Sequence, residues 1–283
     1  MKKAILVFLA LLVGLVRLAF FQFPDSNLHI VACDVGQGDA ILITYKKVQI
    51  LTDGGPNNKV LGCLARHMPF WDRKIELVIS THPDADHSTG LIEVVKRYQI
   101  STLLANNLDV STQVWQALKK EAGRRGVKVV YPREGMKLRL GLIYLEILHP
   151  KEQFSILNFQ FSKAKTNEYS VVYLLKYGQF EALMTGDINQ VISDQLSANS
   201  KIGPVEYIKV PHHGSKNGLS EALLAATMPR IAVISVGKNS YGHPHEDVLD
   251  MLARYGLLVL RTDERGDVEV VTDGGKYWLS KGP

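Results

Sequence analysis

Four side chains that commonly bind metal ions lie close together, at His82, Asp84, Asp86 and His87. In an extended segment, positions 82 and 84 point to the same side, so both can reach one cation. Asp86 and His87 are adjacent and diverge, which suits a second cation. Two cations roughly 3.5–4 Å apart can hold the attacking and leaving oxygens of a displacement, so the spacing indicates hydrolysis. The alternative is a polar loop in which Asp86 or Ser88 caps the next helix.

The flanking sequence predicts where this segment lies in the fold. The apolar run at 77–80 is short enough for a buried strand, and apolar residues at 91, 92, 94 and 95 predict a helix over 91–97. The four ligand-type residues would then occupy the loop that leaves the carboxyl end of a strand. Proteins with α/β folds tend to place their chemistry at that edge.

Two later strand ends carry further candidates. Asp187 follows the predicted strand 179–184 after a glycine turn, and a carboxylate at this place can bridge two cations. The alternative is that Asp187 only stabilises the turn. His212 and His213 follow the predicted strand 205–210, and they could supply a metal ligand, a general acid near pKa 6.5, or both. The sequence does not assign these roles between them. Lys216 could hold a phosphate oxygen, or it could be a solvated surface lysine.

The pattern His82-x-Asp84-x-Asp86-His87 resembles the signature of the metallo-β-lactamase superfamily, with Asp84 where a second histidine usually stands. That departure itself resembles the extracellular hydrolase domain of the ComEC family of DNA-uptake proteins. The resemblance runs in order from about residue 28 to about residue 275. Further matching stretches lie at 34–39, 167–170, 185–187, 210–216, 241–244 and 261–263.

The resemblance implies a metal-dependent hydrolase, specifically a phosphodiesterase or nuclease acting on DNA outside the cytoplasm. It makes Asp187 the bridging carboxylate and His243 the last metal ligand. His149 stands roughly where the middle histidine of the superfamily falls, but Pro150 and a long connection at 149–167 leave its direction open. The resemblance also implies that Asp34, Asp39 and Asp53 support the metal-binding loops through hydrogen bonds. The alternative is that they only stabilise the turns formed with the neighbouring glycines.

The predicted elements form two halves with one plan, antiparallel strands first and strand–helix units after. The first half has strands at 28–33, 40–45 and 48–52, and the second has strands at 136–140, 142–148, 170–176 and 179–184. Helices are expected at 60–67, 111–122, 189–198, 219–226 and 246–255. This plan, together with the superfamily resemblance, predicts an α/β (α+β) fold, a four-layer αββα sandwich of the metallo-β-lactamase type.

The composition is that of a globular protein of 283 residues, with 46% hydrophobic and 22% charged residues. Lys and Arg number 33 against 28 Asp and Glu, a mild excess that does not by itself indicate nucleic acid. Lys2 and Lys3 precede an apolar stretch at 4–16, so residues 1–24 are expected to be a membrane anchor or a signal segment. Residues 25–283 would form the hydrolase domain outside the cytoplasm, anchored or secreted. Cys33 and Cys63 could form a disulfide there, but the sequence does not show their geometry.

Two divalent metal ions are the expected cofactors, and DNA and the membrane are the expected partners. Because Asp84 offers a hard oxygen in place of an imidazole nitrogen, manganese is favoured and zinc is possible. Two alternatives stay open. The protein could instead hydrolyse a small or cell-surface phosphoester, or it could be a metal-stabilised binding module without turnover.

Overall fold

The computed structural model describes residues 24–106, 112–151 and 163–280, together with scattered positions between residues 3 and 14. More than half of the predicted anchor or signal segment at 1–24 lies outside the described residues. Among the described residues, no helix has the length and apolar character needed to cross a membrane.

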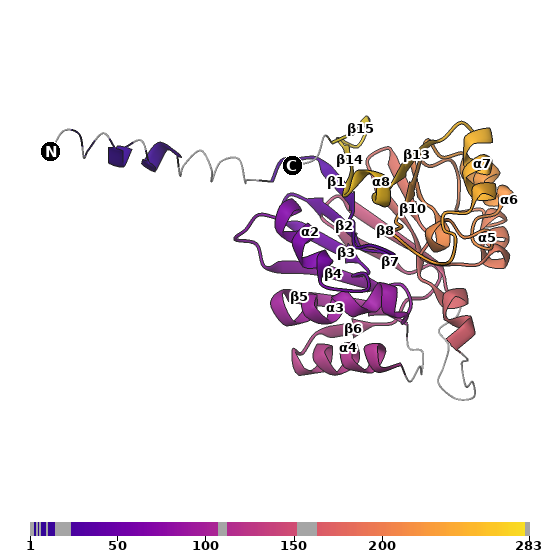
Figure 1. Ribbon diagram of the computed structural model, residues 1–283, viewed down its shortest axis with the longest axis horizontal. Helices are drawn as coiled ribbons and strands as arrows, with labels where there is room; N and C mark the ends of the chain where they lie inside the picture. Colours follow the sequence, from indigo (N-terminus) through magenta and orange to yellow (C-terminus); the bar gives the residue numbers. More distant parts are fainter. Residues whose placement is uncertain are drawn as a thin grey trace.

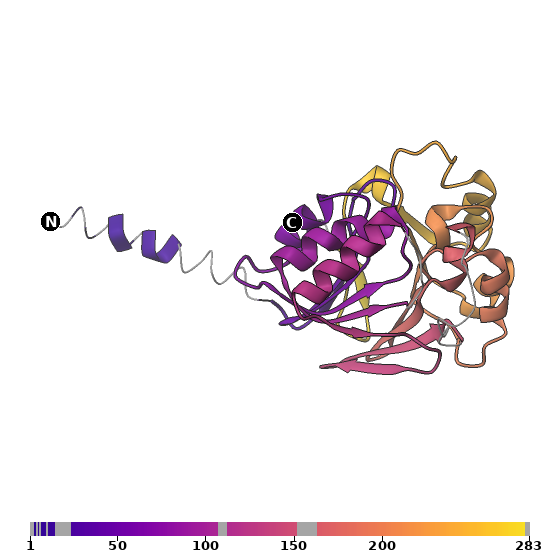
Figure 2. The same ribbon diagram turned by 90° about the horizontal axis from the view of Figure 1, so that it is seen from below.

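Within the described residues, fifteen strands form two sheets that face each other (Figures 1 and 2). The first sheet has the order β15-β14-β1-β2-β3-β4-β5-β6, and the second has the order β13-β12-β11-β10-β9-β8-β7. The first sheet contains β1 (Leu28–Ala32), β2 (Ile41–Tyr45), β3 (Val48–Thr52), β4 (Lys74–Ser80), β5 (Gln99–Ala105), β6 (Lys128–Val130), β14 (Val268–Thr272) and β15 (Tyr277–Leu279). The second contains β7 (Lys137–Leu140), β8 (Ile143–His149), β9 (Val172–Tyr177), β10 (Phe180–Met184), β11 (Tyr207–Lys209), β12 (Ile231–Ile234) and β13 (Leu258–Arg261).

Helices cover the outer face of each sheet (Figure 1). The helices over the first sheet are α2 (Lys59–His67), α3 (Ala85–Arg97) and α4 (Gln113–Arg124). Those over the second are α5 (Gln190–Ser197), α6 (Glu221–Thr227) and α7 (Glu246–Arg254). Short helical turns occur at η1 (Lys163–Tyr169), η2 (Pro211–Gly214) and α8 (Thr262–Arg265).

Strand alternation explains why the layers pack in this way. In β1, Ile30 and Ala32 face the core between the two sheets, whereas Val31 faces the core beneath α2 and α3. Tyr173 of β9 lies in the inter-sheet core, and its hydroxyl hydrogen-bonds Thr52 Oγ1 of β3 at 2.6 Å. A third apolar core lies between the second sheet and its helices. Three cores between four layers confirm the αββα sandwich.

The two halves repeat one plan, as the sequence predicts. Strands β1, β2 and β3 pair antiparallel, and β3 to β6 pair parallel. In the second sheet β7 to β10 pair antiparallel, and β10 to β13 pair parallel. The sequence did not predict β14 and β15, which add to the first sheet beside β1.

Two features add to the sequence-based expectations. The start of α3 differs from the expected position, and the pairing of the two cysteines, which the sequence left open, is settled. Helix α3 begins at Ala85 rather than near 91, so Asp86 and His87 lie in its first turn instead of a loop. The apolar periodicity begins late because the first turn faces polar groups, not the core. Cys33 and Cys63 form a disulfide that joins the end of β1 to α2, with a Cα–Cα distance of 5.8 Å.

Candidate metal centre

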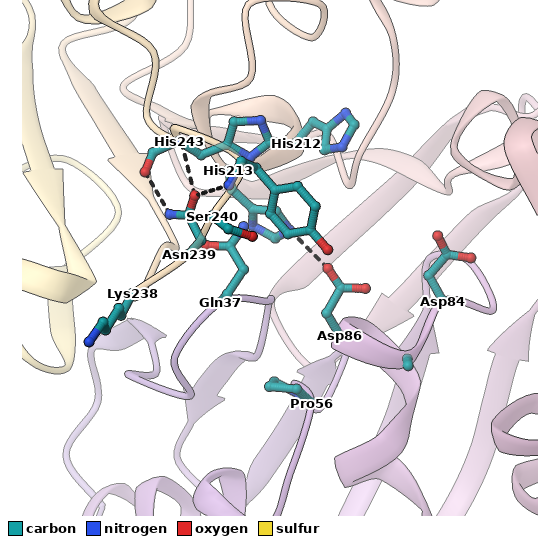
Figure 3. A pocket seen from close by; sticks show the side chains of 12 residues that line it. Gln37, Pro56, Asp84, Asp86, His212, His213, Lys238, Asn239, Ser240 and His243 are labelled. Atoms are coloured by element: carbon teal, nitrogen blue, oxygen red, sulfur yellow. Dashed lines mark hydrogen bonds and ion pairs between the residues drawn. The ribbon is translucent and has the colours of Figure 1, made fainter.

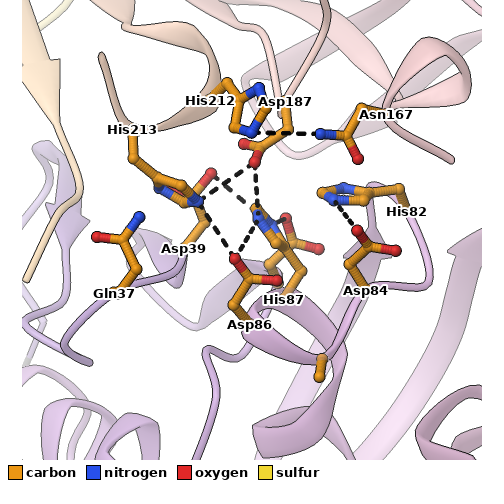
Figure 4. Close-up of polar contacts among 12 residues, drawn as sticks. Gln37, Asp39, His82, Asp84, Asp86, His87, Asn167, Asp187, His212 and His213 are labelled. Carbon is orange, nitrogen blue, oxygen red and sulfur yellow. Dashed lines mark hydrogen bonds and ion pairs between the residues drawn. The ribbon is translucent and has the colours of Figure 1, made fainter. Parts of the chain in front are cut away.

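The candidate metal centre lies where the carboxyl ends of strands from both sheets meet (Figure 4). His82 follows β4, and the first turn of α3 carries Asp86 and His87. Asp187 follows β10, and His213 follows β11. The sequence-predicted residues therefore converge from both halves of the chain.

Four of these side chains surround one point, and we call them the inner set: Asp86, His87, Asp187 and His213. His87 Nε2 and His213 Nε2 each lie 3.2 Å from Asp187 Oδ2. Asp86 Oδ2 lies 3.5 Å from His213 Nε2 and 3.9 Å from His87 Nε2. Two imidazole nitrogens and two carboxylates of this kind are a suitable donor set for a divalent transition metal.

Three buried atoms of the inner set make no hydrogen bond among the described residues. Among the described residues, His87 Nε2, His213 Nε2 and Asp187 Oδ1 are buried and accept or donate no hydrogen bond. Buried polar atoms are nearly always satisfied in folded proteins, so a group that binds all three is expected there. A cation fits this requirement because each of these atoms can act as a ligand.

The opposite edges of the histidine rings are held in place. His87 Nδ1 donates to Asp53 Oδ2 at 2.9 Å, and His213 Nδ1 donates to the Ser235 carbonyl at 2.9 Å. Asp53 also accepts hydrogen bonds from the Thr81 main chain and hydroxyl at 2.8 and 2.6 Å. These bonds orient each Nε2 towards the centre, an arrangement typical of histidines that bind metal.

His82 and Asp84 form a looser pair beside the inner set, which we call the outer set. His82 Nε2 lies 3.9 Å from Asp84 Oδ2, and the His82 ring lies 4.1 Å from the His87 ring. Because the Thr81 hydroxyl donates to Asp53, His82 Nδ1 donates to Thr81 Oγ1 at 3.0 Å, and Nε2 is free to be a ligand. His82, His87 and Asp187 offer ligand atoms within 4.8 Å of one another. Asp187 could therefore serve both positions.

The charges of the metal-free centre are balanced by histidine protonation. Burial disfavours charged imidazoles, but the Asp187 carboxylate raises the pKa of both His87 and His213 well above their usual range. Burial likewise disfavours a charged Asp187, yet these imidazoles hold its pKa well below the ordinary value. Burial and the charge of His87 lower the pKa of His82 to about 3. A cation binding here would displace protons from the imidazoles.

Lys209 is a functional candidate that the sequence reasoning missed. Its side chain is buried in β11, with Nζ 2.5 Å from Asp39 Oδ2 and 3.5 Å from Asp187 Oδ1. Burial disfavours an ammonium, but these two carboxylates, Asp39 first, raise its pKa and keep it charged. A lysine inside a parallel strand that is buried on both faces was the available signal, because such a lysine needs an internal partner.

Of the three aspartates predicted to support the metal-binding loops, two reach the centre and one does not. Asp53 and Asp39 lie at the centre, and Asp39 Oδ1 is 3.5 Å from His213 Nδ1. Asp34 does not reach it: its carboxylate accepts from Gly36 N at 3.2 Å within a turn. The main chain of Asp34 instead donates to Asp267, which also contacts His67 at the end of α2.

The structure does not bring His149, His243 or Lys216 into either ligand set. His149 Nε2 donates to the Glu168 carbonyl at 2.8 Å, so that nitrogen is already engaged, because β8 directs the ring towards η1. The His243 ring stacks on Tyr241, with centroids 5.7 Å apart. Lys216 is exposed beyond the η2 turn, so its predicted phosphate contact has no support in the geometry.

His212 and His213 separate in space although they are adjacent in sequence. Both have positive φ, 51° and 54°, a conformation that side-chain-bearing residues seldom adopt and that is often found at functional sites. This turn sends His213 into the inner set and leaves His212 half-buried at the rim, with Nε2 3.5 Å from Asn167 Nδ2. Burial lowers the pKa of His212.

A cavity of about 910 Å³ opens over the centre (Figure 3). The end of the long 149–167 connection also reaches this region, since Thr166 Oγ1 donates to Asp84 Oδ1 at 2.8 Å. The lining residues include Asp84, Asp86, His212, His213, Tyr241 and His243. The centre is thus accessible to a substrate from one side.

Solved structures with the same architecture cover most of the chain. YhfI from Bacillus subtilis, a metallo-β-lactamase fold protein, aligns with a TM-score of 0.57 at 12% identity, covering 89% of this chain and 100% of that one. Zn²⁺-bound PqqB from Methylobacterium extorquens aligns with a TM-score of 0.58 at 13% identity, covering 87% and 99%. The chain has the metallo-β-lactamase fold. Together with the clustered histidines and aspartates, this fold supports divalent metal binding.

Sequence comparison finds relatives among competence proteins. ComE operon protein 3 of Bacillus subtilis is 26% identical over 90% of this chain, and Recombination protein 2 of Haemophilus influenzae is 29% identical over 89%. Competence protein ComA of Neisseria gonorrhoeae is 26% identical over 92%. The metallo-β-lactamase fold chain covers 34%, 30% and 34% of these relatives, about a third of each. No protein-family model matches the sequence. The resemblance to ComEC-type competence proteins is confirmed, for this part of their length.

Proposed function

We propose that this metallo-β-lactamase fold chain is a metal-dependent phosphodiesterase that cleaves DNA outside the cytoplasm, with manganese as its favoured cation. The observation that carries the proposal is the inner set, in which the buried His87 Nε2 and His213 Nε2 both face the Asp187 carboxylate and make no hydrogen bond among the described residues. Two cations held by the inner and outer sets would act as Lewis acids on a phosphodiester and make water acidic near neutral pH.

Side chains of the protein would bridge the two cation positions, balance the charge of the centre and transfer protons. Asp187 joins the two positions, because its carboxylate lies against His87 and His213 and within ligand distance of His82. The Lys209 ammonium holds Asp39 and Asp187 in place by charge and limits the negative charge of the centre. His213 is committed to the inner set, which leaves His212 for proton transfer.

His212 suits that role by position and by charge. It lines the open cavity, and its lowered pKa keeps the imidazole neutral at neutral pH. A neutral imidazole can take a proton from the attacking water and give it to the departing oxygen of the ester. The Asn167 amide beside Nε2 would orient the ring.

DNA as the substrate is supported by the competence relatives, and an extracytoplasmic location by two features of the chain. Lys2 and Lys3 before the apolar stretch at 4–16 favour a cytoplasmic amino terminus followed by export. The Cys33–Cys63 disulfide is of a kind that persists mainly in oxidising compartments. We propose residues 1–24 as an anchor or signal segment and residues 25–283 as the hydrolase domain.

The test uses the purified full chain in detergent, loaded with manganese and offered single-stranded DNA, duplex DNA and a small chromogenic phosphodiester. We expect DNA cleavage that chelation abolishes and manganese restores. His87→Ala is the matched inactive control, because it removes one inner ligand. Cleavage of the chromogenic ester alone would favour a small or cell-surface phosphoester as substrate. A metal-loaded protein that cleaves nothing would favour a binding module and overturn the proposal.

A further inference from the structure

The loop 237–245 between β12 and α7 is fixed by a single side chain. Asn239 Nδ2 donates to the carbonyls of Gly237 and His243 at 2.9 and 2.7 Å. Its Oδ1 accepts from the main-chain N–H groups of Tyr241 and His243 at 3.0 and 3.1 Å. Two donated and two accepted bonds use the full hydrogen-bonding capacity of an asparagine amide. The loop is therefore rigid where it borders the cavity.

This rigid loop presents Tyr241 to solvent. Tyr241 is 74% exposed, yet it lines the cavity above the metal centre. Its ring stacks on His243 with an interplanar angle of 29°, and the His243 ring lies edge-on to His212, 5.6 Å away. The three rings form a continuous aromatic path from the rim to the proposed proton-transfer residue, and the positions of His212 and His243 are visible in Figure 3.

A basic residue lies on the same rim. Lys238 is exposed and lines the same cavity, within the loop that carries Tyr241. An exposed aromatic ring and a basic side chain that line one cavity are the combination that binds single-stranded nucleic acid, because bases stack on the ring while the cation meets the backbone. In a duplex the base faces are already stacked on one another, so the ring would find no free face.

We propose that Tyr241 is a stacking platform for an unpaired base next to the scissile phosphate, with Lys238 contacting a neighbouring phosphate. Single-stranded DNA is then the preferred substrate. This inference rests on the proposed function, since it names the form of DNA that the same centre takes. Tyr241 acts through base stacking, so its hydroxyl is dispensable.

The test compares a single-stranded oligonucleotide with the same backbone carrying abasic sites. Wild-type full chain should bind and cleave the base-bearing strand better than the abasic one. Tyr241→Ala should raise the KM for the base-bearing strand about 5- to 150-fold, the range expected for loss of one stacked base, with kcat nearly unchanged. Tyr241→Phe should behave as wild type. Tyr144→Ala, at a 45% exposed tyrosine on β8, is the matched control and should leave the KM and kcat for both strands unchanged.

Two readouts separate a structural role from stacking. Metal content should be the same in Tyr241→Ala and wild type, and the variant should no longer distinguish base-bearing from abasic strands. Equal loss on both strands, or no loss on either, would overturn the proposal. Binding measured by fluorescence anisotropy with calcium in place of manganese decides the matter even if the wild type cleaves no DNA, so failure of the proposed function is separately visible.

Discussion

The two candidate cation positions differ in how completely the protein assembles them. The inner set draws ligands from both halves of the sandwich, whereas the outer set has only His82 and Asp84 of its own, 3.9 Å apart. Asp86 of the inner set is 38% exposed and Asp84 of the outer set is 25% exposed, but the inner set adds His87, His213 and Asp187, which are at most 3% exposed. Ligands that are already oriented lose little freedom on binding, so we expect the inner position to fill first and the outer one to bind more weakly.

The difference shows which contacts orient the candidate ligands in this fold. The inner histidines donate hydrogen bonds to the Asp53 carboxylate and the Ser235 carbonyl, which orient their rings, and both acceptors directly follow strands, β3 and β12. Asp84 is instead held by Thr166 of η1, which follows the long connection. The outer position therefore depends on η1 as well as on the end of β4. The predictions below act on both positions, on one of them, or on neither.

The largest effect is expected from Asp187→Ala, because it removes the carboxylate that both positions share. Metal and hydrolysis should be lost together, with activity falling to background. Metal analysis beside DNA-cleavage rates checks this, with Asp247→Ala, at a carboxylate 79% exposed on α7, as the control. Full nuclease activity in Asp187→Ala would sink the mechanism.

His212→Ala should slow hydrolysis by roughly 10²- to 10⁴-fold while metal stays bound, the usual range for loss of an acid–base group. His213→Ala, one residue away, should instead lose the inner cation as well as activity. Metal content and kcat of the two variants distinguish them. If both variants retain full metal, or both lose it, the division between the two histidines is wrong.

Lys209→Met should destabilise the metal-free protein by about 3–5 kcal/mol, because it leaves the buried Asp39 carboxylate without its cation. Manganese should recover part of the loss, since it binds beside the same carboxylates. Urea unfolding with and without chelator measures both effects. Lys201→Met, at a lysine 42% exposed, is the control. An unchanged free energy of unfolding would show that Lys209 is not a charge partner.

Asp84→His acts on the outer position alone and should shift its metal preference. An imidazole nitrogen in place of a hard oxygen favours zinc, so zinc-supported hydrolysis should rise relative to manganese-supported hydrolysis. Rates measured with each metal on both proteins give the ratio. A wild type that works equally well or better with zinc alone would contradict the manganese preference.

The smallest effect is expected outside both positions, at Asp267. Burial raises the pKa of its carboxyl, but hydrogen bonds from His67, the Asp34 main chain and Arg66 outweigh this and lower the pKa to about 2. A depressed folded-state pKa stabilises the protein above the unfolded value of 3.8, and this contribution is lost as the pH falls towards 2. Asp267→Asn should therefore cost about 2 kcal/mol at pH 7 and nothing near pH 2.

Metal content of Asp267→Asn should equal that of the wild type, because Asp267 contacts α2 and the Asp34 turn rather than the ligand sets. Chemical unfolding at several pH values gives the stability difference. A difference that stays constant down to pH 2, or a loss of metal, would contradict this assignment.

The candidate ligands that could be predicted from the sequence are those that lie close together along the chain. His82, Asp84, Asp86 and His87 stand in one short stretch, so their proximity follows from chain connectivity. Asp187 could be recognised because a strand and a glycine turn precede it. The repeated plan of strands and helices predicted the sandwich for the same reason, since strand alternation and helix periodicity are local patterns.

Properties that depend on tertiary contacts could not be predicted. Lys209 pairs with Asp39 across 170 positions of sequence, and nothing local indicates the partner. The start of α3 was placed too late because its first turn faces the metal centre and lacks apolar residues. His149 is the last residue of β8, but its ring donates to the Glu168 carbonyl of η1 instead of entering the centre. Strand β14 pairs with β1 from the far end of the chain, and β15 pairs with β14.

The central claim is that two cation positions of unequal completeness share Asp187. A manganese titration of the metal-free full chain, followed by electron paramagnetic resonance, tests it most directly. We predict that the first equivalent binds more tightly and gives a single-ion spectrum. The second equivalent should produce a spin-coupled spectrum, because two cations at these positions would share the Asp187 carboxylate and would lie close enough to couple. Saturation at one manganese per chain, or two ions without coupling, would contradict the account.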